Sequence, residues 1–445
     1  MSQTALPPGP KGHFVFGNLR EFGTDVLGFF TRCAREYGDI VRLRLANRTA
    51  YLLNHPDYIE YVLVTNNKNF IKHSFFWRHM RKMFGQGLLT SEGDFWLRQR
   101  RLAQPAFHRD RIASYGEVMV AYAERMVDGW GEGEMRNLHE DLLSVTLEIV
   151  AKVLFDADVA KDVEAVGQAL DAITRESAVR LRRPFYIPDA VPLPSNIRYL
   201  RAVRRMDKLV YRIIREHRRA DQDAGDLVSM LLESRDEAGR GMSDRQLRDE
   251  AITILLAGHE TVALALSWTW YLLSQHPTAE RQLVDELRRV LGDRLPCVAD
   301  LPALRYTERV IKEAMRLYPP VYSFGREAVD DCEIGGYAVP AGTTLFMSPW
   351  VMHRHPRYFE QPDAFLPERW DGDLVERLPK FAYLPFGGGP RLCIGSRFAM
   401  MEAVLLLAAI AQRFHFSLVP ERPVTLFPSI TLRPKDGVWV RLSER

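Results

Sequence analysis

The sequence has little of what disulfide-stabilised, disordered or nucleic-acid-binding proteins depend on. Only four of its 445 residues are cysteine, which argues against a disulfide framework and for a reducing compartment. Sixty Lys and Arg residues face 57 Asp and Glu residues, so the formal charge is only +3 and lacks the basic excess typical of nucleic-acid binding. Neither internal repeats nor low-complexity tracts are present. A content of 47% hydrophobic and 26% charged residues excludes a disordered or fibrous chain.

Membrane and targeting signals are also scarce. The first residues lack the basic start and apolar core of a secretory signal peptide. Residues 251–274 are apolar and could cross a bilayer, but His259 and Glu260 interrupt them, and a mid-membrane charge costs at least a few kcal/mol. Residues 403–411 are too short to form a second span. We therefore interpret 251–274 as a buried central helix, and we expect a cytoplasmic protein with no integral membrane anchor.

Hydrophobic periodicity indicates a large helical protein with small sheets near both ends. Apolar and basic residues alternate over 41–45 and strand signals return at 50–53, which predicts a hairpin. From about residue 57 to 420 the pattern is mainly helical. Residues 430–432 and 438–440 flank an Asp-Gly pair and predict a second hairpin.

The chain contains no convincing linker. A proline-punctuated connection near 184–194 and a polar loop at 221–225 interrupt the helical pattern without dividing it. We therefore expect one domain over residues 1–445 that begins with a proline-rich lead at 5–12.

A glycine-rich stretch leads to the cysteine with the clearest chemical context. Three consecutive glycines cannot form a stable helix or strand, and a long helix is predicted over 396–412. Cys393 then lies near a helix N-terminus, where free N–H groups, the helix dipole and Arg391 favour a thiolate. Because no second cysteine or histidine is close, a tetrahedral zinc site does not fit, whereas iron held by a macrocycle needs only one sulfur.

Phe386, Gly389, Arg391, Cys393 and Gly395 occur in the order Phe-x-x-Gly-x-Arg-x-Cys-x-Gly. With this pattern the stretch resembles the haem-binding loop of the cytochrome P450 family. The resemblance covers about residues 5–442. It implies a mainly α-helical cytochrome P450 fold, with a large helical body and small β-sheets near the N- and C-termini. It also implies haem b, iron protoporphyrin IX, as cofactor, with Cys393 as the ligand of the metal.

The middle of the predicted central helix resembles the oxygen-activation motif of the same family. The resemblance implies that Ala257 lies against the haem, that Glu260 passes protons inward and that Thr261 holds the reacting oxygen through its hydroxyl. Gly258 weakens the helix, and a mid-helix hydroxyl can bend it, so together they could open a groove. His259 occupies the variable position of the motif, and we expect it to be non-catalytic.

Two further motifs of the family are present. Glu313 and Arg316 share one helix face, and Arg369 follows in a Pro-Glu-Arg segment. The resemblance assigns these three to structural support of the cysteine loop. It also implies that cationic side chains bind the two haem propionates, although a solvated helix face would equally explain an Arg-rich helix. Trp96 and Arg100 match the family's Trp-x-x-x-Arg motif and are assigned to the propionates together with Arg326 and Arg391.

The resemblance implies a monooxygenase that inserts one oxygen atom of O2 into a lipophilic small molecule. Electrons would come from a ferredoxin or flavodoxin with its reductase, which would dock on a basic surface that includes Arg98, Arg101 and Arg109. We expect a monomer with no nucleic-acid partner. Two alternatives stay open: a non-enzymatic haem sensor, which would not need Glu260 and Thr261, and a haem-thiolate isomerase or peroxygenase, which would need no reductase.

The substrate pocket follows only by analogy with the family. Its expected walls are residues 70–90, the connection near 184–194, the central helix and two loops of the C-terminal half. Their apolar side chains indicate a terpenoid, carotenoid, steroid or fatty acid. The predicted lining residues are Phe84, Leu88, Leu89, Leu255, Val321, Tyr322, Phe324 and Ile430.

Overall fold

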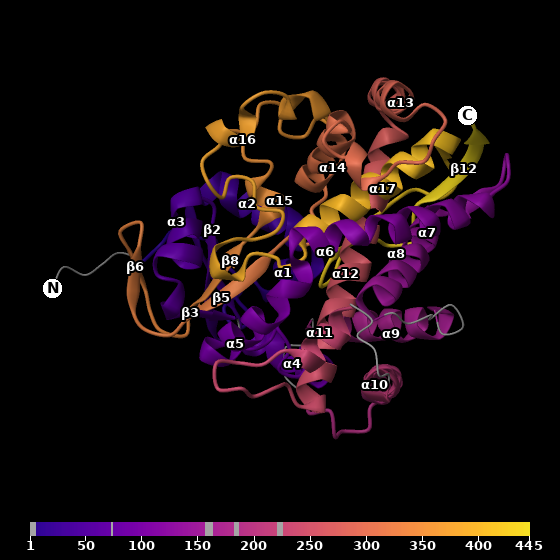
Figure 1. Cartoon of the computed structure of the whole chain (residues 1–445). Helices are drawn as coiled ribbons and strands as arrows, with labels where there is room; N and C mark the ends of the chain where they lie inside the picture. The colour runs from indigo at the N-terminus through magenta and orange to yellow at the C-terminus, as the bar shows by residue number, and fades with distance from the viewer. Residues whose placement is uncertain (1–5, 73, 156–162, 182–186, 220–225) are drawn as a thin grey trace.

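The computed structural model describes residues 6–72, 74–155, 163–181, 187–219 and 226–445. Most helices gather on one side of the molecule, while the largest sheet and the first helices form the other (Figure 1). The predicted helical body with small sheets is confirmed. The described α-helices are α1 (Leu19–Thr24), α2 (Val26–Tyr37), α3 (Pro56–Glu60), α4 (Ser74–Phe84), α5 (Gly93–Ala103), α6 (Arg109–Ser114), α7 (Gly116–Asp128), α8 (Leu138–Phe155), α9 (Val163–Leu181), α10 (Pro194–Arg219), α11 (Leu227–Glu233), α12 (Asp244–Leu273), α13 (Pro277–Leu291), α14 (Arg305–Leu317), α15 (Pro349–Met352), α16 (Leu374–Arg377) and α17 (Ser396–Arg413).

The strands of the described residues form four small sheets. The largest has the order β1-β2-β8-β5-β3, in which β2 and β8 are parallel and the other neighbours are antiparallel. The predicted N-terminal hairpin is confirmed as β1–β2, and strands from the middle of the chain extend it. The strands are β1 (Ile40–Leu45), β2 (Arg48–Leu53), β3 (Phe70–Lys72), β4 (Met135–Asn137), β5 (Phe324–Ala328), β6 (Cys332–Ile334), β7 (Tyr337–Val339), β8 (Thr344–Met347), β9 (Phe414–Leu418), β10 (Leu426–Pro428), β11 (Leu432–Pro434) and β12 (Trp439–Glu444).

The predicted C-terminal hairpin is wrong. Strands β11 and β12 flank the Asp-Gly pair but do not pair with each other. Instead, β11 pairs with β10, and β12 lies between β4 and β9. The buried side chains of β12, Val440 and Leu442, belong to the core of the helical body. A local turn signal therefore could not identify the partner strands, which tertiary packing supplies.

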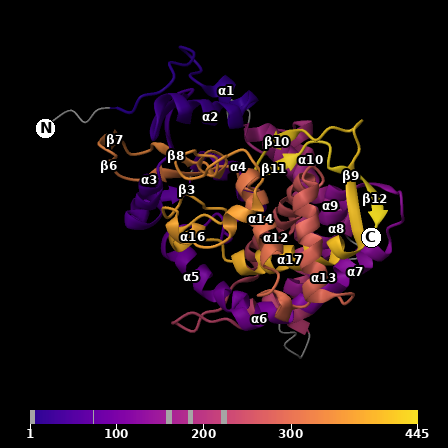
Figure 2. The same cartoon turned by 90° about the horizontal axis from the view of Figure 1, so that it is seen from above.

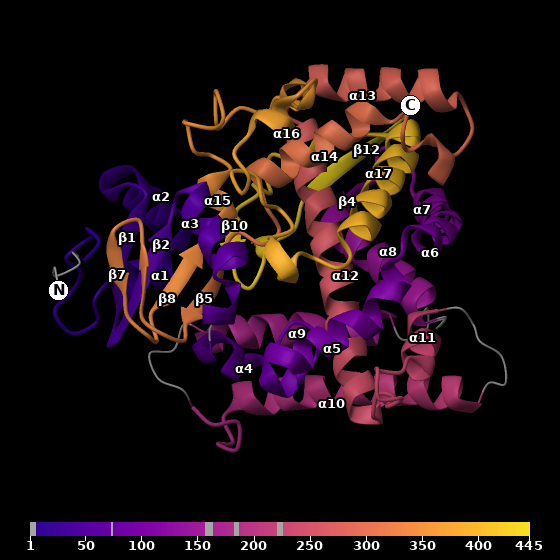
Figure 3. The same cartoon turned by 60° about the vertical axis from the view of Figure 1, so that its left-hand side comes forward.

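Helix α12 is the centre of the helical body. It begins after Ser243, whose hydroxyl accepts a hydrogen bond from the Gln246 N–H (3.2 Å) and so caps the helix. It packs against α8, α10, α14 and α17 (Figure 2), and it runs from α13 and α14 at one end to α10 at the other (Figure 3). Among the described helices, α12 alone has the length and composition to cross a membrane, yet 78% of its most apolar window is buried in the protein. This burial agrees with the predicted core helix.

Candidate active site

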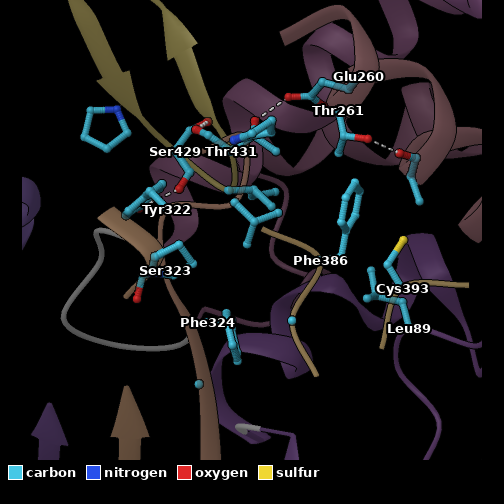
Figure 4. A pocket seen from close by; sticks show the side chains of 18 of the residues that line it. Leu89, Glu260, Thr261, Tyr322, Ser323, Phe324, Phe386, Cys393, Ser429 and Thr431 are labelled. Atoms are coloured by element: carbon cyan, nitrogen blue, oxygen red, sulfur yellow. Dashed lines mark hydrogen bonds between the residues drawn. The ribbon is translucent and has the colours of Figure 1, made fainter. Parts of the chain in front are cut away.

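The loop before α17 takes a backbone path that requires glycine. Gly387 and Gly389 have φ angles of +70° and +67°, in the left-handed region. A side chain on Gly389 would also overlap the carbonyl oxygen of Leu63. The Cys393 N–H donates to the Phe386 carbonyl (3.1 Å) and closes the loop. The Cys393 side chain therefore lines a cavity on whose far side lies α12 (Figure 4).

The thiol of Cys393 is exposed and lines this cavity. Burial raises the pKa of Cys393 above its ordinary value, and the hydrogen bond from the Gly395 N–H and the charge of Arg100 oppose this only in part. The guanidinium of Arg391 pairs with Glu92, and its role in favouring a thiolate stays a prediction. Coordination to a metal ion is what would deprotonate this thiol.

The cavity fits an iron macrocycle better than a metal held by protein ligands alone. Its volume is about 950 Å³, and it lies between α12 and the loop of Cys393. Within the described part of the chain, no group of three or more His, Cys, Asp or Glu side chains comes together to hold a metal ion. Cys393 would thus be the one protein ligand from that part, which suits iron whose other positions a porphyrin occupies.

Three cationic side chains line one region of the cavity and repel one another. Burial, together with the charges of Arg326 and Arg391, lowers the pKa of Lys72 well below its ordinary value. Burial and Arg391 likewise lower the pKa of Arg326 to about 10. Glu92 is the acid that partly compensates them. Such an excess of buried positive charge fits the two carboxylates of a porphyrin. The sequence did not reveal the direction of Lys72, because β3, which carries it, is only three residues long.

The two residues of the Trp-x-x-x-Arg motif separate in the structure. Trp96 lines the cavity, and the Arg391 guanidinium lies 4.3 Å from the centre of its ring. Arg100 does not line the cavity and donates instead to the Leu392 carbonyl (2.9 Å), next to Cys393. The assignment of Arg100 to a propionate stays a prediction.

Replacement of Lys72 by Met should weaken haem retention. We expect haem transfer to apomyoglobin to accelerate roughly tenfold, because a hydrogen bond to a charged group contributes about 1.5–3 kcal/mol. Lys68→Met is the matched control, since Lys68 lies on the same segment, is exposed and does not line the cavity. Equal transfer rates for both variants would remove Lys72 from the haem site.

On the far side of the cavity, Thr261 is held within the ladder of α12. Its hydroxyl donates to the Ala257 carbonyl (2.7 Å), and both residues line the cavity (Figure 4). A Cβ on Gly258 would lie 2.7 Å from the Val150 side chain of α8, so glycine is needed there for close helix packing. The α-helix continues without interruption from Asp244 to Leu273, so the expected local opening is not a break in the helix.

Glu260 is buried and held by the C-terminal segment. One carboxylate oxygen accepts hydrogen bonds from the Thr431 hydroxyl and from Arg433 Nε (2.7 Å). Although burial alone would raise the pKa of Glu260, the charge and hydrogen bond of Arg433 lower it to about 2. The neighbouring His259 is buried away from the cavity, and burial lowers its pKa to about 4. Glu260 is therefore a carboxylate, and a proton route through it has to open the pair with Arg433.

Most of the predicted pocket residues line the cavity, and Leu255 does not. Leu255 lies two positions before Ala257, on the far face of α12, where it contacts a small void between α8, α9 and α10. The described part of the connection near 184–194 does not line the cavity, and residues 182–186 lie outside the described residues. The predicted residues that do line it are Phe84, Leu88, Leu89, Val321, Tyr322, Phe324 and Ile430.

The cavity also extends to a region that the sequence did not indicate. Helix α1, the turn between β1 and β2, and strand β10 line this part. These segments lie far apart in the sequence, so no local pattern connects them with the site. Their lining side chains include Leu19, Phe22, Asn47, Leu426 and Phe427.

The three residues assigned to structural support meet in one buried cluster. The Glu313 carboxylate accepts two hydrogen bonds from Arg316 (2.8 and 2.9 Å), and others from Arg369 Nε (2.8 Å), Trp370 Nε1 (2.8 Å) and the Leu366 N–H (3.0 Å). Glu313 and Arg316 are both 0% exposed, so neither charge has a solvent partner. Their full set of hydrogen bonds is what makes the buried charges tolerable.

This cluster connects to the segment that leads into the cysteine loop. Arg316 donates to the His353 carbonyl (2.9 Å), and His353 Nε2 accepts the Leu384 N–H (2.9 Å). The Tyr383 hydroxyl donates to the Lys312 carbonyl of α14 (3.0 Å). The path from α14 to Leu384 supports the predicted bracing of the loop.

The predicted docking arginines are only partly available. Arg98 donates to Asp236 (2.7 Å) and to the Arg240 and Gly241 carbonyls, so it holds the 236–241 loop and is not a free surface charge. Arg101 pairs with Glu237 (3.1 Å) but remains 65% exposed. The side chain of Arg109 lies outside the described residues.

The family model described as Cytochrome P450 matches residues 7–440. The chain belongs to the cytochrome P450 family. Its solved neighbours include the haem domain of cytochrome P450DA, with a TM-score of 0.90 and 28% identity over 100% of this chain and 98% of that chain.

Two bacterial relatives are similar over most of the sequence. Cyclooctatin synthase of Streptomyces melanosporofaciens is 39% identical, over 89% of this chain and 87% of that protein. Pentalenene oxygenase of Streptomyces avermitilis is 36% identical, over 88% of this chain and 87% of that protein. The protein is thus a haem-dependent cytochrome P450 monooxygenase, a class of enzyme that uses O2 and electrons from a redox partner.

Proposed function

We propose that this cytochrome P450 inserts one oxygen atom into a terpenoid, by hydroxylation or epoxidation, with haem b held by Cys393. The observation that carries the proposal is the position of Cys393 and Thr261 on opposite sides of one mostly apolar cavity (Figure 4). The names of the bacterial relatives support a terpenoid over the other lipophilic classes.

The chain would hold the cofactor through one sulfur ligand and three cationic side chains. Cys393 would ligate the iron, while Lys72, Arg326 and Arg391 would neutralise the propionates. When bound, the haem supplies the reductive activation of O2. Thr261 presents a hydroxyl from α12 at the far wall, where it can hold a proton close to the reacting oxygen. The apolar walls exclude water and orient the substrate.

The proposal also includes the class of the redox partner. We infer a ferredoxin or flavodoxin with its reductase, docked on the side of the cysteine loop, where Arg101 remains exposed. A single domain, a monomeric state and a cytoplasmic location belong to the same proposal. Thr261 and Glu260 at the cavity disfavour a sensor, and a requirement for an electron donor would exclude an isomerase or peroxygenase.

The test is turnover with a reconstituted ferredoxin or flavodoxin system and isotopically labelled O2. We expect cyclic terpenes to gain one labelled oxygen atom only when reductant is present. Product formed without reductase would favour the isomerase or peroxygenase alternative, and label-free product would contradict a monooxygenase.

Replacement of Thr261 by Ala should uncouple electron use from product formation. We expect product per electron pair to fall roughly tenfold or more, with the remainder released as hydrogen peroxide, because positioned proton transfer contributes about 10²–10⁴-fold. Thr269→Ala is the matched control: Thr269 makes the same 2.7 Å bond to the Ala265 carbonyl on α12 but does not line the cavity. Coupling that stays unchanged in Thr261→Ala would contradict the role of the hydroxyl.

A further inference from the structure

The loop after α4, residues 85–90, is attached to α12 by two carboxylates; we call it the distal loop. The Gln86 N–H donates to Asp249 Oδ2 (2.8 Å), and the Leu88 N–H donates to Glu250 Oε2 (2.8 Å). Asp249 is 3% exposed and Glu250 is 0% exposed. Two adjacent acids at the start of α12 thus hold alternate backbone groups of the loop.

Neighbouring side chains of α12 keep both carboxylates in place. Gln246 Nε2 donates to Glu250 Oε1 (2.7 Å), so both oxygens of Glu250 are bonded. Arg248 Nη1 donates to Asp249 Oδ1 (2.7 Å) and to the Met83 carbonyl (2.8 Å) at the end of α4. The carboxylates are therefore oriented by their own helix, as pre-arranged acceptors should be.

Two glycines allow the loop to approach this closely. A side chain on Gly85, which has a φ of +53°, would overlap the Asp249 carboxylate. A side chain on Gly87 would overlap the Thr253 hydroxyl and come within 2.5 Å of the Asp249 carbonyl. The backbone of the distal loop therefore lies directly on α12, with no side chain between them.

The distal loop and the end of α4 carry three apolar side chains into the cavity: Phe84, Leu88 and Leu89. Thr253 lines the cavity from α12, beneath the same loop. We propose that Glu250 and Asp249 are positioning residues that set how far the distal loop stands from α12, and thereby which bulky substrates the cavity admits. This inference rests on the proposed function, since it assigns substrate selection to the cavity of that reaction.

The ionisation of Glu250 makes this attachment sensitive to pH. Burial raises the pKa of Glu250 to about 7, against the hydrogen bonds from Leu88 and Gln246, and Asp249 raises it further. The nearby cation Arg248 is engaged by Asp249 and by Asp207 of α10 (2.7 Å). Below about pH 7, Glu250 gains a proton and loses the charge that strengthens the bond from the Leu88 N–H. The loop should then be held less firmly in acid than at pH 8.

The experiment compares two ligands of the haem iron in the full-length holoprotein. Imidazole binds the iron without reaching the distal loop, whereas 1-dodecylimidazole also fills the apolar cavity. Their dissociation constants are measured by the shift of the Soret band at pH 6 and 8, and their ratio largely cancels the protonation of the ligands themselves. The variants are Glu250→Gln and Gly87→Ala, and the control is Glu237→Gln, whose side chain is 93% exposed.

We expect Glu250→Gln to weaken the binding of 1-dodecylimidazole roughly tenfold relative to imidazole at pH 8, because a neutral amide oxygen accepts the Leu88 N–H more weakly than a carboxylate does. In the wild type, the dissociation constant of 1-dodecylimidazole relative to that of imidazole should rise several-fold from pH 8 to pH 6. In Glu250→Gln this pH dependence should vanish. Gly87→Ala displaces the loop without altering a carboxylate, and it should also weaken the binding of 1-dodecylimidazole relative to imidazole. This variant tests the inference if Glu250→Gln takes up no haem. A wild-type ratio in Gly87→Ala, or wild-type pH dependence in Glu250→Gln, would overturn the inference.

Failure of the proposed function would look different. Ligand binding needs only the haem iron, so it tests the distal loop even in a protein that forms no oxygenated product. Loss of product with an intact, pH-sensitive ligand ratio would therefore contradict the proposed reaction and leave the role of Glu250 standing.

Discussion

Exchange of Cys393 for histidine is expected to abolish monooxygenase activity and to change the spectrum of the reduced carbon monoxide complex. The wild type should show the strongly red-shifted Soret band of thiolate-ligated haem, and Cys393→His should show the band of histidine-ligated haem. Activity should be lost because a thiolate donates electron density to the iron and so favours O–O cleavage, whereas an imidazole donates far less. We expect turnover to fall by at least about 10³-fold, beyond the roughly 10²–10³ typical of one lost hydrogen-bond donor.

Two comparisons make this result specific. Cys297→Ser should leave both spectrum and turnover unchanged, because Cys297 is exposed and does not line the cavity. A wild-type protein that binds no haem, or that already shows a histidine-like band, would contradict the assignment of Cys393 and the oxygenation proposed for it.

Replacement of Glu313 by Gln is expected to cause a large loss in the free energy of unfolding. The change leaves Arg316, at 0% exposure, without its carboxylate and weakens the bonds from Arg369, Trp370 and Leu366. Removal of one partner of a buried ion pair costs about 3–5 kcal/mol of the free energy of unfolding, much of the 5–15 kcal/mol of a typical protein. We expect a lower urea midpoint and reduced haem content, since the cluster connects through His353 to the segment before the cysteine loop.

Glu308→Gln is the control on the same helix. Glu308 pairs with Lys312 at 2.8 Å, but its side chain is 43% exposed, so its loss should change stability by no more than about 0.5 kcal/mol. If Glu313→Gln and Glu308→Gln unfold at the same urea concentration, the buried cluster does not brace the fold.

Local sequence was sufficient wherever a short segment carries its own constraint. The glycine-rich turn, Cys393 and the helix after it are adjacent in the chain, so their relation could be predicted from residue types alone. The same holds for the Ala257–Thr261 bond, because residues four apart on a helix always meet.

Other features depended on partners from distant segments. Lys72 lies close to the other cavity cations because β3 pairs with β5, which carries Arg326. The ion pair between Arg391 and Glu92 joins the cysteine loop to a residue almost 300 positions earlier, as the separation of 299 residues shows. The low pKa of Glu260 comes from the charge and hydrogen bond of Arg433, which lies 173 positions later in the chain.

By itself the sequence determined the family, the cysteine that faces the cavity before α17 and the acid and alcohol of α12 that line the opposite wall, because each is encoded in one contiguous motif. Only the tertiary structure decided the strand partners at the C-terminus, the charge state of Glu260, the inaccessibility of Leu255 to the cavity and the attachment of the distal loop to α12. The physical reason is that burial, ion pairing and strand pairing depend on which side chains and backbone groups meet in space, and those groups come from segments that no local pattern connects.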